Sequence, residues 1–448
     1  MTLRYRDILQ KAWPVVLANA SIPLLGLSDT AVIGNLGTLS DLGAIAFGAV
    51  IFSFVYWGFG FLRMGTTGFV AQAVGARDEI EVRAAFMRAL IMAVLIGVLL
   101  ILIQSAISTV SLGLLQGSDA VETITRDYIA TRIWGAPAAL VLFAISGCLI
   151  GLGMNKTLLM VQLVLNGLNI VLDILFAGVW GMGAQGIALG TAIAEWTTVI
   201  LGLWLLYRAL RQRLRGSALA TDVLFVPMDR LRDKTRWRQT LAANGDIMIR
   251  TLLLVASFAW FVRQSAQFGD DVLAANHILL QLISFSAFFL DAFAYVAEAL
   301  AGEAAGAKDI SAFDVAVRKT TELSGMCALG LAAVILFAGN SIVPLISQHE
   351  SVIVAATTSL PYAALYVALA FAAFQLDGIF IGTTRTREMR NASVASALVF
   401  VALSLVLIQQ WQLTGLWMAF IVFVGLRALC LGWYLPALRR SILPCRET

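Results

Sequence analysis

Long apolar stretches separated by polar connections run through the whole chain. Each apolar run of about 18 residues or more is long enough to cross a hydrocarbon core about 30 Å thick. Segments of strand length with alternating polarity, which are typical of membrane β-barrels, do not occur. The pattern therefore predicts an all-α membrane protein.

The apolar stretches predict about twelve transmembrane helices, six on each side of one long polar connection. The predicted helices are 14–34, 46–73, 85–112, 128–150, 157–180, 183–207, 240–263, 273–300, 316–346, 355–381, 393–410 and 415–438. This pattern divides the chain into an N-terminal lobe (1–207), a basic cytoplasmic linker (208–239), a C-terminal lobe (240–438) and a cytoplasmic tail (439–448).

The two predicted lobes resemble each other in sequence. A-V-G-A-R-D at 73–78 recurs as A-A-G-A-K-D at 304–309, about 231 residues later, and Gly147-x-x-x-Gly151 recurs as Gly378-x-x-x-Gly382 at the same shift. Leu17-Ala-Asn19 matches Ala242-Ala-Asn244 at a slightly shorter shift. Two six-helix bundles related as parallel repeats, with the substrate path between them, are a recognised transporter plan.

Composition and charge support the membrane interpretation. The residues are 60% hydrophobic and 13% charged, whereas a soluble domain has roughly 25% charged residues. The net charge of +4 does not indicate nucleic-acid binding, because roughly 25 of the 31 Lys and Arg lie in segments that an N-inside topology places in the cytoplasm. We therefore expect a bacterial inner-membrane protein with both termini in the cytoplasm.

Four polar residues in the first lobe are predicted to lie at one depth in the membrane. They are Asp29 in the first helix, Asn169 and Asp173 in the fifth, and Thr191 in the sixth. At a rise of about 1.5 Å per residue, all four fall in the outer half of the bilayer. Ionisable groups inside a membrane are expensive and are functional candidates by default.

These four side chains suit the binding of a small cation. Their oxygens are ligands that a hard cation such as Na⁺ prefers. Two close carboxyls in a low-dielectric site also favour a shared, exchangeable proton. The alternative is that each polar group only bonds a neighbouring helix; four such residues at one depth favour the cation site.

The second half carries further polar residues in its predicted helices. Asp246 and Arg250 are four residues apart on one predicted helix. Asp291 and Asp377 lie at a similar depth, as does Arg63 in the first half, so ion pairs could form among these residues. Asn276 and His277 lie near the outer end of their predicted helix. Asn244 is included because the repeat matches it to Asn19. Structural pairing and a place on the substrate path both remain open for this set.

The chain also resembles a known family in sequence. The stretches that carry the resemblance are Pro14 followed by Asp29 in S-D-T-A-V-I-G, V-A-Q-A-V-G-A-R-D at 70–78, N-I-V-L-D at 169–173, A-A-N-H-I-L-L-Q at 274–281, F-F-L-D-A-F-A-Y-V-A-E-A-L at 288–300 and L-D-G-I-F-I-G at 376–382. In these stretches it resembles the multidrug and toxic compound extrusion (MATE) transporters, and most of all their DinF-like branch.

The resemblance implies a function and assigns roles to residues. It implies two lobes around a central cavity and the export of amphipathic, often cationic xenobiotics in exchange for protons or sodium. It carries the family's cation site over to Asp29, Asn169, Asp173 and Thr191, and its proline-dependent helix bend to Pro14. The acidic residue that NorM-like members carry further along the seventh helix is missing between 250 and 259.

We therefore expect a secondary antiporter with no cofactor other than its coupling ion, H⁺ or Na⁺. The expected partners are small organic substrates and membrane lipid, without nucleic acid, and the resemblance implies a monomer. A lipid-linked oligosaccharide flippase is the alternative within transport. A membrane enzyme is disfavoured, because no hydrolase, P-loop or paired metal-ligand motif occurs.

Overall fold

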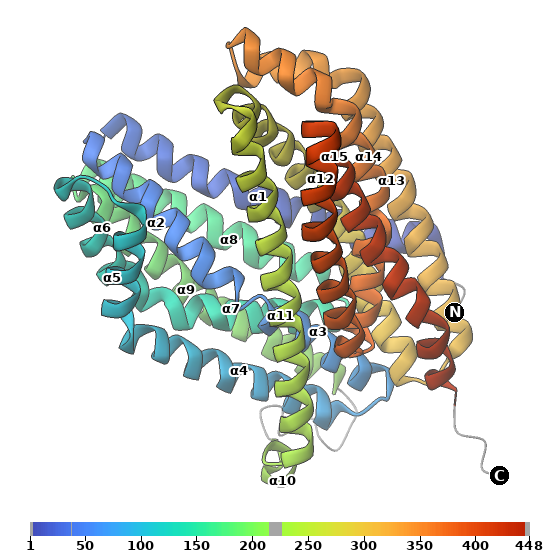
Figure 1. Cartoon of the computed structure of the whole chain (residues 1–448). Helices are drawn as coiled ribbons and strands as arrows, with labels where there is room; N and C mark the ends of the chain where they lie inside the picture. Colours follow the sequence, from blue (N-terminus) through green and yellow to red (C-terminus); the bar gives the residue numbers. More distant parts are fainter. Residues whose placement is uncertain (1–2, 37, 215–225, 444–448) are drawn as a thin grey trace. The chain divides into compact units, whose positions relative to one another are not determined.

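The computed structural model describes residues 3–36, 38–214 and 226–443, and these residues fold into α-helices without a strand (Figure 1). Ten of the described helical stretches are long and apolar enough to cross a membrane. The all-α membrane fold predicted from the apolar pattern is therefore confirmed.

The helices of the first half are α1 (Tyr5–Leu36), α2 (Leu39–Trp57), α3 (Phe61–Gly75), α4 (Glu79–Leu102), α5 (Gln104–Leu115), α6 (Asp119–Arg132), α7 (Ala136–Gly151), α8 (Asn155–Asp173) and α9 (Gly183–Arg213). Those of the second half are α10 (Met228–Leu231), α11 (Lys234–Ser265), α12 (Asp270–Gly306), α13 (Ile310–Ile346), α14 (Glu350–Gly382) and α15 (Thr386–Ile442). Short turns η1 (Ile133–Gly135), η2 (Ile174–Val179) and η4 (Ala266–Phe268) connect or extend them.

Several predicted helices differ from the observed ones in their bounds. The predicted helix 46–73 is split into α2 and α3 around Gly58 and Gly60, since glycine lowers helix propensity. In contrast, the predicted helices 393–410 and 415–438 are joined in α15, which is interrupted by a non-helical Gln412 (φ 49°, ψ −127°). The predicted linker 208–239 is partly helical, since α9 continues to Arg213 and α11 begins at Lys234.

The chain folds into two compact units that do not follow a simple cut in the sequence. One unit contains Met1–Val16, Ala71–Arg77 and Thr240–Thr448, and the other contains Leu17–Val70 and Asp78–Gln239. The division at 239/240 falls at the end of the predicted linker. The prediction differs for 1–16 and 71–77, which were assigned to the N-terminal lobe but belong to the first unit.

The glycines that recur in the two halves of the sequence make equivalent close contacts with backbone in the structure. In the second unit, a Cβ on Gly147 would lie 2.3 Å from the Arg63 carbonyl oxygen. In the first unit, a Cβ on Gly378 would lie 2.5 Å from the Ala294 carbonyl oxygen. Arg63 and Ala294 are also about 231 residues apart, so the same helix crossing is built twice.

The end of α3 joins the first unit through the same type of contact. A Cβ on Gly75 would lie 1.9 Å from the Glu303 carbonyl oxygen, and a Cβ on Gly306 would lie 2.0 Å from the Gln72 carbonyl oxygen. The side-chain amide of Gln72 donates to the Gly382 carbonyl oxygen at 3.1 Å. These contacts account for the position of 71–77 within the unit that contains the second half of the chain.

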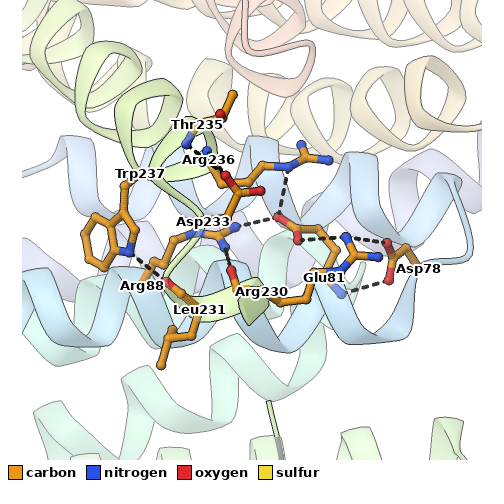
Figure 2. Close-up of polar contacts among 9 residues, drawn as sticks. All are labelled: Asp78, Glu81, Arg88, Arg230, Leu231, Asp233, Thr235, Arg236 and Trp237. Atoms are coloured by element: carbon orange, nitrogen blue, oxygen red, sulfur yellow. Dashed lines mark hydrogen bonds and ion pairs between the residues drawn. The ribbon is translucent and has the colours of Figure 1, made fainter. Parts of the chain in front are cut away.

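A polar cluster fixes the start of α11 to α4 in the second unit, as Figure 2 shows. The buried Arg88 guanidinium donates to Glu81 Oε1 at 2.5 Å and to the Arg230 carbonyl oxygen at 3.4 Å. Arg236 contributes a longer contact to Glu81, and Trp237 Nε1 donates to the Leu231 carbonyl oxygen at 2.7 Å. The segment that leads into α11 is thus attached to the second unit up to Gln239.

Candidate cation site

The four polar residues predicted for the cation site lie on three helices of the second unit. Asp29 is in α1, Asn169 and Asp173 are one turn apart in α8, and Thr191 is in α9. The Asn166 side-chain amide ties α8 to α1 by donating to Ser21 Oγ at 2.7 Å. Asp29 and Asp173 follow this bond by about two turns each, which brings both carboxyls to one level.

The amide of Asn169 is oriented by Thr191. Asn169 Nδ2 donates to Thr191 Oγ1 at 2.9 Å, and the Thr191 hydroxyl donates to the Ile187 carbonyl oxygen at 2.8 Å. Because this hydrogen bond occupies the amide nitrogen, the side-chain oxygen of Asn169 remains available as an acceptor. Asn169 and Asp173 have no exposed surface.

Four buried acceptor oxygens meet no hydrogen-bond donor among the described residues. They are Oδ1 of Asp29, Oδ1 of Asn169 and both carboxyl oxygens of Asp173. The Asp29 and Asp173 carboxyls are close enough to interact with each other. A buried acceptor without a partner is costly, and a proton or a small cation between these oxygens would satisfy them.

The local backbone leaves room for the Asp173 carboxyl. A Cβ on Gly190 of α9 would lie 2.6 Å from Asp173 Oδ1, so only glycine fits there without displacement. Directly after Asp173 the helix continues as the π-helical turn η2, a feature that is frequent at functional sites.

Two further charged residues of the site escaped the sequence analysis. The buried Arg132 of α6 donates to both oxygens of Glu195 of α9, at 2.8 and 2.6 Å. Arg132 lies within electrostatic reach of Asp29 and Asp173. Glu195 follows Thr191 by one helical turn, and this spacing on one helix face was the signal available in the sequence.

Asp377 and Asp246, two predicted site residues of the second half, form separate charged groups in the first unit. Asp377 of α14 accepts hydrogen bonds from Arg250 and from Arg427, the latter at 2.5 Å. Asp246 instead accepts from Arg390 at 2.7 Å and from Thr386 at 3.0 Å. Ion pairing of Asp246 and Asp377 was predicted, but their partners Arg390 and Arg427 were not.

The remaining polar residues of the second half lie on α11 and α12. Asn276 donates to Ser265 Oγ at 2.9 Å and accepts from Trp417 Nε1 at 3.1 Å. Its side-chain amide therefore links α12 to α11 and α15 inside the first unit. His277 is exposed, with its ring nitrogen 3.2 Å from Gln281 Nε2. Asn244 is buried on α11, and Asp291 is half-buried on α12.

Pro14 lies well inside α1, because the helix begins at Tyr5 and not at Pro14 as predicted. The early start is supported by contacts within the first unit. Tyr5 donates its hydroxyl to Glu322 at 2.5 Å, and Lys319 donates to the Leu3 carbonyl oxygen at 2.6 Å. A proline in the interior of a helix removes a backbone hydrogen bond and favours a bend.

Comparisons with known proteins agree on one family. The MatE family model matches residues 14–175 and 247–406. The chain is 37% identical to DNA damage-inducible protein F of Escherichia coli over 425 residues, which cover 94% of this chain and 90% of that protein.

Solved structures share the fold at low sequence identity. The Vibrio cholerae MATE transporter VcmN in its bent form has a TM-score of 0.85 at 19% identity, with 98% of both chains covered. A MOP superfamily transporter from Pyrococcus furiosus has a TM-score of 0.85 at 17% identity and covers 98% of this chain and 96% of its own.

Proposed function

Because this chain belongs to the MATE family, whose members are efflux transporters of drugs and toxic compounds and not enzymes, we propose that it exports small organic compounds in exchange for H⁺ or Na⁺ by alternating access. The observation that carries this proposal is the set of four buried acceptor oxygens of Asp29, Asn169 and Asp173. Such a set binds a proton or a small cation and gives it up when the helices around it move.

The proposed substrates are amphipathic and cationic xenobiotics. The buried carboxyls of the second unit attract organic cations and also the coupling ion, so the two compete for the same negative charge. The lipid-flippase alternative is not favoured, because the matching family and the similar proteins are efflux transporters.

The proposed setting is the bacterial inner membrane, with both termini in the cytoplasm. The distribution of Lys and Arg supports this orientation. We propose a monomer that contacts small organic substrates and membrane lipid, without nucleic acid and without a cofactor other than the coupling ion. Pro14 is proposed as the point where α1 bends during transport.

The direct test uses ethidium export from proteoliposomes with proton and sodium gradients imposed separately. Asp29→Asn and Asp173→Asn should each abolish export, because an amide cannot exchange a proton and binds a cation weakly. Asp119→Asn, which changes an exposed carboxyl at the start of α6, is the matched control and should export normally. The gradient that drives the unchanged protein identifies the coupling ion.

Two results would contradict the proposal. One is export at the normal rate by both carboxyl variants. The other is ethidium movement that follows neither gradient. Equal amounts of folded protein in the liposomes, measured by size-exclusion chromatography before reconstitution, ensure that a loss of export reports on the site.

A further inference from the structure

A second buried charged group lies beside the candidate cation site. The Arg132 guanidinium is held by two hydrogen bonds to Glu195, and its carbon lies 5.3 Å from the centre of the Phe52 ring and 5.6 Å from that of Tyr56. Arg132 and Glu195 are 7% and 6% exposed. A fork-to-fork pair beside two aromatic rings of α2 fixes the direction of the guanidinium as well as its position.

The backbone of Gly135 lies directly against this pair. A Cβ on Gly135 would lie 2.4 Å from Glu195 Oε2 and 2.7 Å from Arg132 Nη1. Trp196, the residue after Glu195, donates its indole N–H to the Trp134 carbonyl oxygen at 3.0 Å. This bond ties α9 to the turn η1, which directly follows Arg132.

The pair shares one helix, α9, with the candidate cation site. Glu195 lies one turn after Thr191 on α9, and Arg132 lies one turn after Tyr128 on α6. Arg132 is within electrostatic reach of both Asp29 and Asp173, and Tyr128 is within reach of the same two carboxyls. Arg132 is thus the positive side chain whose field acts on the carboxyls that would bind the ion.

We infer that the Arg132–Glu195 pair sets the affinity of the Asp29–Asp173 site for the coupling cation. Glu195 holds the guanidinium by both edges and offsets its charge, so the two aspartates keep enough negative potential to bind a cation. Arg132 in turn limits that potential, so the cation is also released. This inference rests on the proposed function and assigns Arg132 and Glu195 as positioning residues.

The charge argument predicts opposite effects for the two single neutral variants. In Glu195→Gln the positive charge of Arg132 is no longer offset, so the coupling cation should bind about tenfold more weakly. In Arg132→Gln the negative charge of Glu195 is added to that of the aspartates, so the cation should bind about tenfold more tightly. The double variant Arg132→Gln/Glu195→Gln removes both charges and should return to within about threefold of the original affinity.

The experiment measures ethidium export by the full-length protein in proteoliposomes as a function of the coupling-ion concentration. The ion is the one whose gradient drives the unchanged protein, and the readout is its half-saturating concentration. Arg213→Gln, which breaks the pair with Glu79 at the far end of α9, is the control and should not change this value. Asp173→Asn is measured in parallel.

A single variant with an unpaired buried charge can fail to fold. The double variant has no such charge, and Glu195→Asp keeps the charge while it pulls the carboxyl back from the guanidinium. Glu195→Asp should weaken cation binding in the same direction as Glu195→Gln, by a smaller factor. These two variants keep the inference testable when the single neutral variants are lost.

The outcomes separate this inference from the proposed function. Opposite shifts in the single variants, or weaker binding in Glu195→Asp with near-normal binding in the double variant, support it. Shifts in the same direction, or folded variants with unchanged half-saturation, overturn it, provided that Asp173→Asn abolishes export. If Asp173→Asn exports normally, the proposed cation site itself is wrong.

Discussion

At the scale of single residues, the last two positions of the repeated hexapeptide have the same structural role in both halves of the chain. Asp78 and Asp309 cap α4 and α13, each accepting a backbone N–H at 2.9 Å from the residue three positions later. The residues before them, Arg77 and Lys308, have positive φ of 55° and 54°. The motif therefore ends one helix and starts the next in both halves of the chain.

The cap of α13 gives a prediction about stability and pH. Hydrogen bonds from the Ala312 N–H and the Ser311 hydroxyl hold the pKa of Asp309 below its ordinary value. The stabilisation is therefore present above the unfolded-state pKa near 4 and is lost as the pH falls through the lowered pKa. Asp309→Ala should lower the thermal unfolding temperature at pH 7 in detergent and should flatten its decrease at acid pH.

Asp309→Asn is the matched control for this prediction. Asparagine is as good a cap as aspartate, so it should keep most of the stability at pH 7, and it has no carboxyl to titrate. An equal loss in both variants would contradict the capping role.

The space beside Asp173 gives a second prediction at this scale. Gly190→Ala places a methyl group where the Asp173 carboxyl lies, 2.6 Å from Oδ1 in the present geometry. Because a small displacement of a binding group is costly, ethidium export should fall by about tenfold or more. Gly167→Ala on α8, whose Cβ would meet no atom within 4 Å, should export normally, and equal export by the two variants would contradict the prediction.

The residues that the structure brings together at the candidate cation site could be predicted because each of them is polar within an apolar run, and their depth follows from helix geometry. Arg132 and Glu195 also lie within predicted helices, 128–150 and 183–207, but their pairing could not be predicted in this way. Arg132 lies at the end of α6, directly before the turn η1. Its partner is 63 residues away, and only the packing of α6 on α9 brings the two together.

At the scale of helices, glycines decide how closely neighbouring helices approach. A Cβ on Gly151 would lie 2.9 Å from the Thr67 carbonyl oxygen, and a Cβ on Gly382 would lie 2.1 Å from the Glu298 carbonyl oxygen. The two crossings are equivalent by the repeat, but the second one is tighter. Close approach of this type is what small residues permit in membrane helices.

The difference between these crossings predicts an order of effects. Gly382→Ala should destabilise the protein by about 1–3 kcal/mol, because backbone must move to admit the methyl group, and Gly151→Ala should cost less. Gly330→Ala on α13, where nothing lies within 4 Å, should be neutral. Thermal unfolding in detergent measures all three, and the reverse order of the first two would refute the packing argument.

The helices themselves could largely be predicted from apolar runs, whereas their breaks could not. Hydropathy is an average over many residues, so it does not register the local break at Gly58 and Gly60 between α2 and α3. The same average misses polar turns that continue a helix, and α11 therefore begins six residues before the predicted start at 240. The first turns of α11 are stabilised by Asp233, which accepts from the backbone N–H of Thr235 and Arg236.

At the scale of the whole molecule, the two compact units are not the two halves of the sequence. Residues 1–16 and 71–77 belong to the unit that contains the second half. Ile8 and Ala12 pack there against Phe293, Val296 and Leu323. A repeat in the sequence predicts two similar bundles, but it does not predict that one of them includes segments from the other half.

This arrangement predicts the behaviour of a divided chain. When residues 226–448 are expressed alone, the unit lacks Ile8, Ala12 and the Gln72–Gly306 contact, so the yield of folded protein in membranes should be low. Co-expression of 1–225 as a separate chain should restore it. Size-exclusion chromatography after detergent extraction measures both, and a stable, monodisperse 226–448 fragment would contradict the assignment.

The π-helical turn η2 directly follows Asp173 and makes the chain sensitive to a change of one residue in length there. A π-helical turn holds one more residue than an α-helical turn in the same axial distance, so η2 acts as a one-residue insertion. Removal of one residue between Ile174 and Val179 would let an ordinary α-helix form. The indole of Trp180, which stacks on the Phe176 ring, would then rotate by about 100° relative to the acid that precedes the turn. A one-residue deletion in η2 would therefore change the direction in which Asp173 points relative to the residues that follow the turn.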